Sequence, residues 1–202
     1  MTPRTRLAPA RRREQLVDLG VKLLSARRLE DLSIDLLAEE AGISRGLLYH
    51  YFAGKREFHL AVLEQMADRV IAITAPTGEG EPLEQLVGSL EAYVGFVSEN
   101  HEAYTSFVRA AAAGDADYQR LHDDARAALT DRIFVAADSE ALAALGLVDT
   151  PAVRLMVRGW SAMVEDVVLA WLDDHSGVER SELLDMLAGS LASVGTIVST
   201  TR

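Results

Sequence analysis

Residues 41–58 read AGISRGLLYHYFAGKREF, and this stretch decides the fold. Gly42 suits the left-handed conformation that ends a helix, and Ser44, two residues later, can cap the start of another helix. Two tyrosines, one phenylalanine and one histidine follow within residues 48–52, although Phe, Trp and Tyr together make up only 6 % of the chain. Two short helices joined by a tight glycine-containing turn describe a helix-turn-helix.

The residues on either side of the turn support two short helices. Ser33 is suited to cap a helix over residues 34–41, and Asp35 lies in its first turn, where an acid is favoured by the helix dipole. In the second helix, Leu48 and Phe52 are four residues apart and therefore share the inward face. The aromatic run is thus expected to be partly core and partly contact surface.

In a DNA-binding helix-turn-helix, side chains at the start of the second helix meet base edges in the major groove. Arg45 is placed to bond a guanine edge, and Gly46 lets DNA approach without a Cβ in the way. The polar tips of residues 49–51 are suited to phosphates and bases, and Lys55 opens the next helix beside its N-terminal amides.

The charge distribution fits one DNA-binding end. The net charge is −11, but residues 1–60 hold 11 basic and 8 acidic residues, whereas residues 61–202 hold 9 and 23. A mildly basic N-terminal third on an acidic remainder is typical of a chain that binds a polyanion through one end. A solvated acidic surface with a basic tail has the same composition, so charge alone leaves both interpretations open.

Composition indicates an all-α protein, and we expect it to be cytoplasmic and to use no cofactor and no metal. Helix formers dominate and strand alternation is absent. The chain has no cysteine, which excludes disulfides, thiolate catalysis and zinc-thiolate sites. Apolar runs fall short of the roughly 20 residues that span a bilayer, and no signal-peptide pattern is present.

Two domains are expected. The first, residues 10–58, is the helix-turn-helix domain, continued by a connecting helix over 55–74. APTGEGEP at 75–82 is the strongest cluster of helix breakers and marks the boundary to residues 75–202. Further helices are predicted at about 83–99, 101–113, 116–145, 151–174 and 179–200, with a possible break at Asp138.

The spacing of Ser33, Leu37-Ala38, Ala41-Gly42-Ile43-Ser44, Gly46, Leu48-Tyr49, Tyr51-Phe52, Lys55 and Phe58 resembles the DNA-binding domain of TetR-family transcriptional regulators. The resemblance covers residues 10–58, and the remainder matches in length and helical layout alone. It implies a homodimer that binds a double-stranded, pseudo-palindromic DNA operator, and a C-terminal domain that binds a small-molecule effector. Carried over by position, phosphate contacts fall to Ser33, Ser44, Tyr49, Tyr51 and Lys55, and base contacts to Arg45, Gly46, Leu47 and His50.

Asp35 departs from this family pattern, because related proteins often carry arginine there and some use it on DNA. A carboxylate would be repelled by phosphate, so we interpret Asp35 as a capping residue, or at most as a cytosine contact. Two alternatives keep the fold without DNA binding. One is a helical hairpin that only packs, and the other is a ligand-binding scaffold with a relic DNA-binding module.

Candidate ligand-binding side chains in the second domain are aromatic or soft residues at helical spacing: Tyr93, Phe96, Tyr104, Phe107, Phe134, Met156, Trp160 and Met163. Such side chains can adapt to irregular apolar ligands, although they more often only pack in the hydrophobic core. They favour a hydrophobic or amphipathic effector that releases a repressor from its operator. Glu165 could add an acid near the cavity, but a solvated helix face is the simpler expectation for it.

Small residues in the last helix favour close contact with a second copy of the chain: Gly189, Ala192, Ser193 and Thr196. With residues 153–172 they can form a four-helix bundle across a two-fold axis. The rival class is a metal-dependent phosphohydrolase built from His101, His122-Asp123 and Asp149. Its weakness is that His122 lies on a strongly polar helix, where an exposed side chain is expected.

Overall fold

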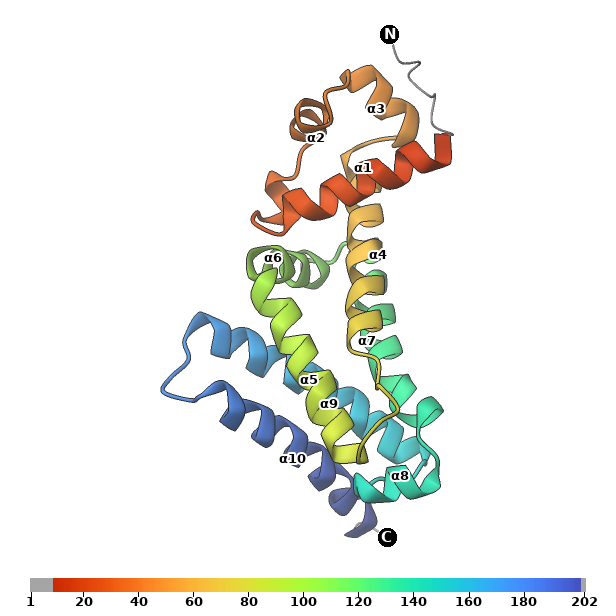
Figure 1. Cartoon of the computed structure of the whole chain (residues 1–202), viewed down its shortest axis with the longest axis vertical. Helices are drawn as coiled ribbons and strands as arrows, with labels where there is room; N and C mark the ends of the chain where they lie inside the picture. Colours follow the sequence, from red (N-terminus) through yellow and green to blue (C-terminus); the bar gives the residue numbers. More distant parts are fainter. Residues whose placement is uncertain (1–8, 201–202) are drawn as a thin grey trace. The chain divides into compact units, whose positions relative to one another are not determined.

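The structure is a computed structural model that describes residues 9–200, except for the side chains of Ala136 and of residues 197–200. Over that range the regular structure is entirely helical, which confirms the all-α prediction (Figure 1). The elements in chain order are α1 (Pro9–Leu24), a 3-10 turn η1 (Leu29–Asp31), α2 (Ile34–Ala41), α3 (Arg45–Tyr51), α4 (Lys55–Ile73), α5 (Pro82–Glu99), α6 (His101–Ala112), α7 (Ala116–Ala136), α8 (Ser139–Ala144), α9 (Pro151–Asp173) and α10 (Arg180–Thr200).

Most helix bounds follow the predicted ones, and two differ for local reasons. The sequence predicts a first helix over about residues 10–27, but α1 ends at Leu24, and the Ser25 hydroxyl and the Arg27 guanidinium donate to carbonyls of its last turn. The long helix predicted after residue 116 breaks where Asp138 offers a cap. Its carboxylate accepts hydrogen bonds from the Glu140 and Ala141 amides and starts α8.

The chain divides into two compact units. The first contains the residues up to Ala67 together with Glu102–Leu121, so α6 and the start of α7 pack with the N-terminal helices. Its core is apolar and includes Leu16, Leu37 and Leu48, which are fully buried. Helix α1 approaches α4 at Gly20, where an added Cβ would lie 2.5 Å from the Val62 side chain.

Polar contacts tie the α6–α7 segment to the rest of the first unit. The buried Ser106 hydroxyl accepts a hydrogen bond from the Leu29 amide at 2.8 Å. The Arg56 guanidinium on α4 bonds the Asp115 and Asp117 carboxylates at 2.6 and 2.8 Å. The pKa of Asp115 is lowered, chiefly by the hydrogen bond from Arg56.

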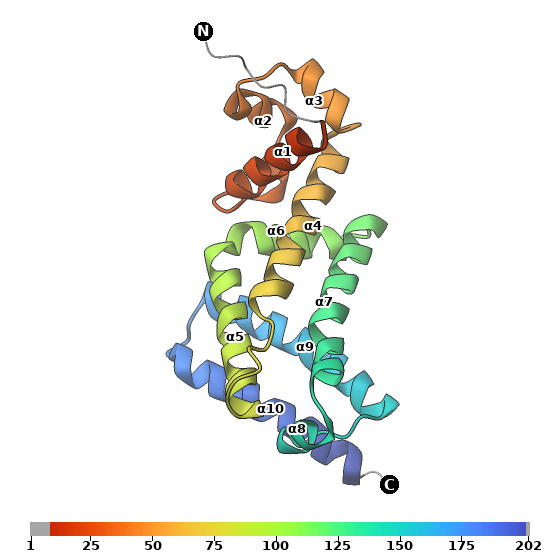
Figure 2. The same cartoon turned by 45° about the vertical axis from the view of Figure 1, so that its right-hand side comes forward.

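The second unit contains Asp68–His101 and the chain from His122 onward. Within it α9 and α10 lie side by side, and α10 also packs on α5 (Figure 2). The Trp160 indole N–H donates to the Ser190 hydroxyl at 2.8 Å across the α9–α10 contact. Gly195 of α10 touches the carbonyl of Gly146, so a larger residue there would overlap backbone.

Helix α4 contributes to both units, up to Ala67 in the first and from Asp68 in the second. Its last turn is held by Arg132 of α7, whose guanidinium donates to the Ile71 carbonyl and the Thr74 hydroxyl, both at 2.8 Å. Burial lowers the pKa of Arg132, but arginine stays charged at any physiological pH. The contact is therefore independent of pH in that range.

Candidate nucleic-acid interface

The helix-turn-helix forms from the local signals that the sequence carries. The Ser33 hydroxyl accepts a hydrogen bond from the Leu36 amide at 3.1 Å and caps α2. Gly42 ends α2 with φ +62°, the left-handed conformation that glycine adopts without strain. The Ser44 hydroxyl then accepts from the Leu47 amide at 3.3 Å and caps α3. Both predicted caps and the glycine turn are confirmed.

The inner face of α3 is anchored on the core. Leu48 and Phe52 are fully buried, as their spacing predicts. The Phe52 ring meets the Phe58 ring edge-on at a centroid distance of 5.2 Å. Arg13 lies on α1, and its guanidinium is 5.0 Å from the centroid of the Phe52 ring. These contacts hold the inner face of α3 against the core. The opposite face of the helix therefore points away from the core of the unit.

The outer face of α3 carries the side chains that the resemblance assigns to DNA. Tyr49 is 56 % exposed, which rules out a core role for its ring in this chain. A Cβ at Gly46 would meet no atom within 4 Å. The remaining members are exposed or half-exposed: Ser44, Arg45, Leu47, His50 and Tyr51 on or beside α3, Lys55 on α4, and the half-buried Ser33 at the start of α2.

Arg45 has a partner that sequence reasoning missed. Its guanidinium Nε forms an ion pair with the Asp35 carboxylate Oδ1, across the turn between α2 and α3. Asp35 is not the capping residue of α2, because Ser33 holds that position. The capping interpretation of Asp35 is therefore wrong. The opposite charges of the two residues were a visible signal, but their ten-residue separation gave no reason to pair them.

Lys55 also has a definite orientation. Its ammonium donates to the Glu30 carbonyl at 2.7 Å, which places the charge beside the start of α4. The Glu57 carboxylate accepts from the Ala53 amide at 2.7 Å just before the same helix. An ammonium has three donors, so the bond to Glu30 leaves others for a phosphate.

A buried histidine supports the interface from behind. His59 is 4 % exposed, and its Nε2 lies 2.6 Å from the Leu32 carbonyl while its Nδ1 lies 3.3 Å from the Tyr118 hydroxyl. The carbonyl can only accept, so Nε2 carries the proton and Nδ1 accepts from Tyr118. The pKa of His59 is lowered, first by burial and further by the charge of Lys55. Folding therefore favours the neutral form of this imidazole, although the hydrogen bond to Leu32 acts in the opposite direction.

The candidate ligand-binding residues do not all lie in one unit. Tyr104 and Phe107 belong to the first unit, whereas the other six belong to the second. Of those six, Tyr93, Phe96, Phe134 and Trp160 are buried. Met156 and Met163 are 39 % and 40 % exposed on α9. Four of the candidates are therefore buried in the second unit, and two are exposed on α9.

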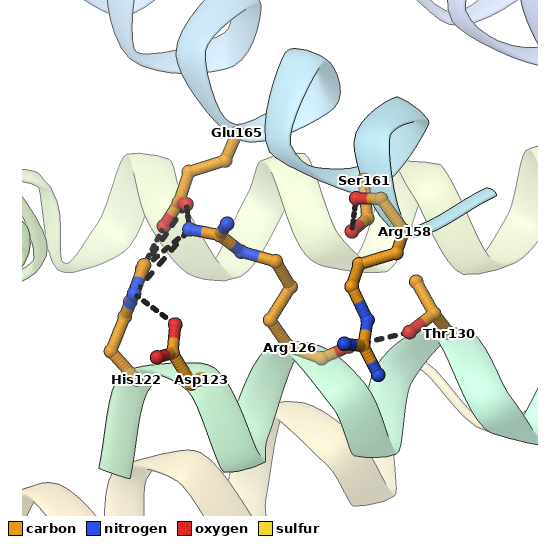
Figure 3. Close-up of polar contacts among 7 residues, drawn as sticks. All are labelled: His122, Asp123, Arg126, Thr130, Arg158, Ser161 and Glu165. Atoms are coloured by element: carbon orange, nitrogen blue, oxygen red, sulfur yellow. Dashed lines mark hydrogen bonds and ion pairs between the residues drawn. The ribbon is translucent and has the colours of Figure 1, made fainter. Parts of the chain in front are cut away.

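A buried charged cluster lies between α7 and α9 of the second unit (Figure 3). The Glu165 carboxylate accepts from His122 Nε2 at 2.9 Å and from Arg126 Nη2 at 2.7 Å. The Glu165 and His122 side chains are only 9 % and 13 % exposed, so the expectation of a solvated face for each was wrong. The Arg126 Nε is buried without a hydrogen-bond partner among the described residues.

The sequence alone indicates two of the three members of this cluster. His122 and Arg126 are four residues apart and share one helix face. Glu165 lies 43 residues further along and pairs with them only through the fold. Across the described part of the chain, no three His, Asp or Glu side chains form a group that could hold a metal ion. The phosphohydrolase alternative therefore lacks its metal site there.

The small residues assigned to a dimer contact lie on the exposed side of α10: Gly189, Ala192, Ser193 and Thr196. Two large apolar side chains of the same unit are also exposed, Met186 on α10 and Leu155 on α9. Val194, by contrast, is buried inside the unit. No helix within residues 9–200 combines the length and apolar character needed to cross a membrane.

Comparisons with known proteins agree with this geometry. The family profile "Bacterial regulatory proteins, tetR family" matches residues 16–62, and "Tetracyclin repressor-like, C-terminal domain" matches residues 82–194. The HTH-type transcriptional regulator BetI from Brucella canis is 36 % identical over 64 residues, 32 % of each chain. BetI from Brucella abortus is 29 % identical over 124 residues, 59 % of this chain and 62 % of that protein. The chain thus matches less than two thirds of the length of either BetI.

Two longer matches extend the comparison. The HTH-type transcriptional activator FasR from Mycolicibacterium smegmatis is 24 % identical over 187 residues, 89 % of this chain and 81 % of that one. A tetR-family regulator from Streptomyces coelicolor has a crystal structure that superposes with a TM-score of 0.82 and 29 % identity, covering 97 % of this chain and 85 % of that chain. The chain therefore belongs to the TetR family of DNA-binding transcriptional regulators, a family without enzymatic activity.

Proposed function

We propose that this protein is a ligand-responsive repressor that binds a palindromic operator as a homodimer and leaves it when a small amphipathic molecule binds. The observation that carries the DNA-binding part is the outer face of α3. It presents a polar and aromatic set on a helix whose inner face is fully buried. A helix fixed in this way can insert into a major groove without reorganising.

The roles of individual residues follow from their chemistry. Arg45 reads a guanine edge, and Gly46 admits the close approach of a base pair. The Tyr49 and Tyr51 hydroxyls and the Lys55 ammonium bind phosphates on either side of the groove. Ser33 and Ser44 add hydroxyls at the two helix starts, and His50 and Leu47 complete the contact with bases.

The exposed strip of α10 supports the homodimer. Gly189 and Ser193 are four residues apart on one face, so a second helix could approach closely there. Met186 and Leu155 add apolar area that a partner would remove from water. Two recognition helices must lie about 34–36 Å apart to enter successive major grooves.

The buried cluster on α7 and α9 supports an amphipathic effector. Ligand sites in proteins are mostly apolar, with a few polar groups that orient the ligand. His122, Arg126 and Glu165 are such a group within an apolar unit, and the Arg126 Nε has a free donor there. A ligand with an apolar body and one hydrogen-bond acceptor would fit this chemistry.

Helix α4 offers a route from effector to DNA. Its last turn is bonded to Arg132, and its first turns hold Lys55 and the core beneath α3. An effector that binds better to one position of this helix would shift the population away from the operator-binding state. Repression follows if the operator overlaps a promoter, and activation would need a different operator position.

Fluorescence anisotropy tests the DNA-binding proposal directly. Labelled fragments of the DNA flanking the gene are titrated with the protein at several salt concentrations. Wild type should bind one fragment tightly, and the logarithm of affinity should fall with the logarithm of salt. Lys55→Ala should weaken binding to all fragments and reduce the salt slope by about 1. Lys22→Ala, an exposed lysine on α1, is the matched control and should leave both quantities unchanged.

The outcome of this titration separates the proposals. Binding to one fragment that is lost on Tyr49→Ala/Lys55→Ala supports an operator-binding regulator. Absence of binding to any DNA, random sequence included, would contradict it and favour the relic-scaffold alternative. In vitro transcription from the bound fragment then distinguishes a repressor from an activator.

A further inference from the structure

We propose that Asp35 is a positioning residue that sets the operator preference of Arg45. Its carboxylate holds the Arg45 guanidinium in one orientation and so decides how that side chain meets a guanine. This inference rests on the proposed function, in which α3 enters the major groove. It adds a residue on α2 to the set that reads sequence, although that residue need not touch DNA.

The backbone fixes both partners before any DNA is present. Asp35 is the second residue of α2 and Arg45 is the first residue of α3. The caps at Ser33 and Ser44 fix where α2 and α3 start, and the left-handed Gly42 ends α2. The ion pair between Arg45 Nε and Asp35 Oδ1 therefore spans a turn of fixed geometry.

The pair leaves the reading edge of Arg45 accessible. A guanidinium has five N–H donors in a planar fork, and Asp35 occupies the Nε position. The two terminal nitrogens keep parallel donors that match the O6 and N7 acceptors of guanine. The Arg45 side chain is 68 % exposed, so most of it is open to solvent within the described part of the chain.

Stability does not explain the pair. Both side chains are more than half exposed, and ion pairs of that kind contribute little to folding. On a surface that faces phosphates, a carboxylate also weakens binding to every DNA sequence. Asp35 is therefore unfavourable for DNA binding in general. The carboxylate favours binding only at operators where the ordered Arg45 side chain contacts the correct base. It therefore increases the difference in affinity between the operator and other DNA sequences.

Selection from a random DNA pool tests the inference. The full-length wild type and the variants Asp35→Ala, Asp35→Asn and Arg45→Ala each select from the same pool, and base preference is scored position by position. Glu39→Ala is the matched control, because it removes an exposed acid from the same helix. Circular dichroism and melting temperature show whether each variant is folded.

We expect wild type to prefer guanine roughly five- to 150-fold at one position of each half-site, the range for one bidentate contact. Arg45→Ala should abolish that preference. Asp35→Ala and Asp35→Asn should reduce it at least threefold at the same position and raise affinity for random DNA. The double variant Asp35→Ala/Arg45→Ala should select as Arg45→Ala does. Glu39→Ala should keep the wild-type preference.

Several results would overturn the inference. Asp35→Ala and Asp35→Asn could keep the full guanine preference while Arg45→Ala loses it, which would mean that Arg45 needs no positioning. The Asp35 variants could instead lose a cytosine preference at another position, which would make Asp35 a direct base contact. A lower melting temperature with unchanged base preference would leave Asp35 a purely structural role. If wild type selected no sequence at all, the proposed operator binding would fail first, and this inference with it.

Discussion

Replacing Gly20 with alanine adds a methyl group where α1 approaches α4. The new Cβ would lie 2.5 Å from Val62 Cγ2 and 2.8 Å from Phe58 Cζ. Carbon atoms in proteins make their best contacts at about 3.5–4.0 Å. Val62 and Phe58 are both fully buried, so neither side chain can turn outward into solvent to relieve the overlap.

Two opposing effects set the size of the change. Alanine is better than glycine inside a helix by about 1 kcal/mol. Overpacking a core costs about 1–3 kcal/mol, and overlap with two buried side chains places Gly20→Ala in the upper half of that range. The expected net loss is about 1–2 kcal/mol of unfolding free energy, since roughly 1 kcal/mol is offset by the helix preference. For a protein of this size that lowers the melting temperature by about 2–8 °C.

Thermal unfolding followed by circular dichroism measures this effect. Gly88→Ala is the matched control, because Gly88 is a glycine inside α5 with no atom within 4 Å of an added Cβ. It should gain about 0.5–1 kcal/mol. The reasoning would be refuted if Gly20→Ala were as stable as wild type while Gly88→Ala behaved as expected. The contact between α1 and α4 would then have room that the structure does not show.

Three further outcomes are expected. The pKa of His59 is lowered in the folded protein, so on acidification His59 takes up a proton in the unfolded chain before it does in the folded protein. The free energy of unfolding should therefore fall as pH decreases below about 6.5. His59→Gln, which keeps a donor for the Leu32 carbonyl, should flatten that slope, and an unchanged slope would exclude His59 as its source. Glu165→Ala leaves the partly buried Arg126 without its counter-charge and should lower the free energy of unfolding by about 3 kcal/mol in urea denaturation. A loss below about 1 kcal/mol would show that water already hydrogen-bonds to the guanidinium. Gly189→Arg should give monomers in sedimentation velocity with unchanged helicity, and an intact dimer would remove α10 from the interface.

The sequence could predict the helix-turn-helix because its signals are local. Ser33, Gly42 and Ser44 each act within a few residues, through a cap or a left-handed turn. The inward positions of Leu48 and Phe52 follow from helical spacing alone. Caps, glycine turns and buried helix positions depend only on residues close in sequence. They can therefore be predicted without knowledge of the fold.

Features that depend on distant partners were not predictable in this way. The polarity of α7 suggested an exposed His122, but its partner Glu165 comes from α9 and buries it. Asp35 has the composition of a helix-start acid, yet its carboxylate turns to Arg45 across the turn. The packing of α6 with the first unit likewise rests on the Ser106–Leu29 contact, which joins residues 77 apart. No periodicity within one helix carries that information.

The two glycines of the helix-turn-helix differ in how far they can change during evolution. Gly42 has a left-handed backbone, so most replacements there would be selected against through folding, whatever the operator. Gly46 is helical and faces open space, so side chains of many kinds can appear there in a folded protein. A descendant of this chain can therefore acquire a new operator preference at position 46 in single steps without losing its fold. Position 42 would stay fixed through the same divergence.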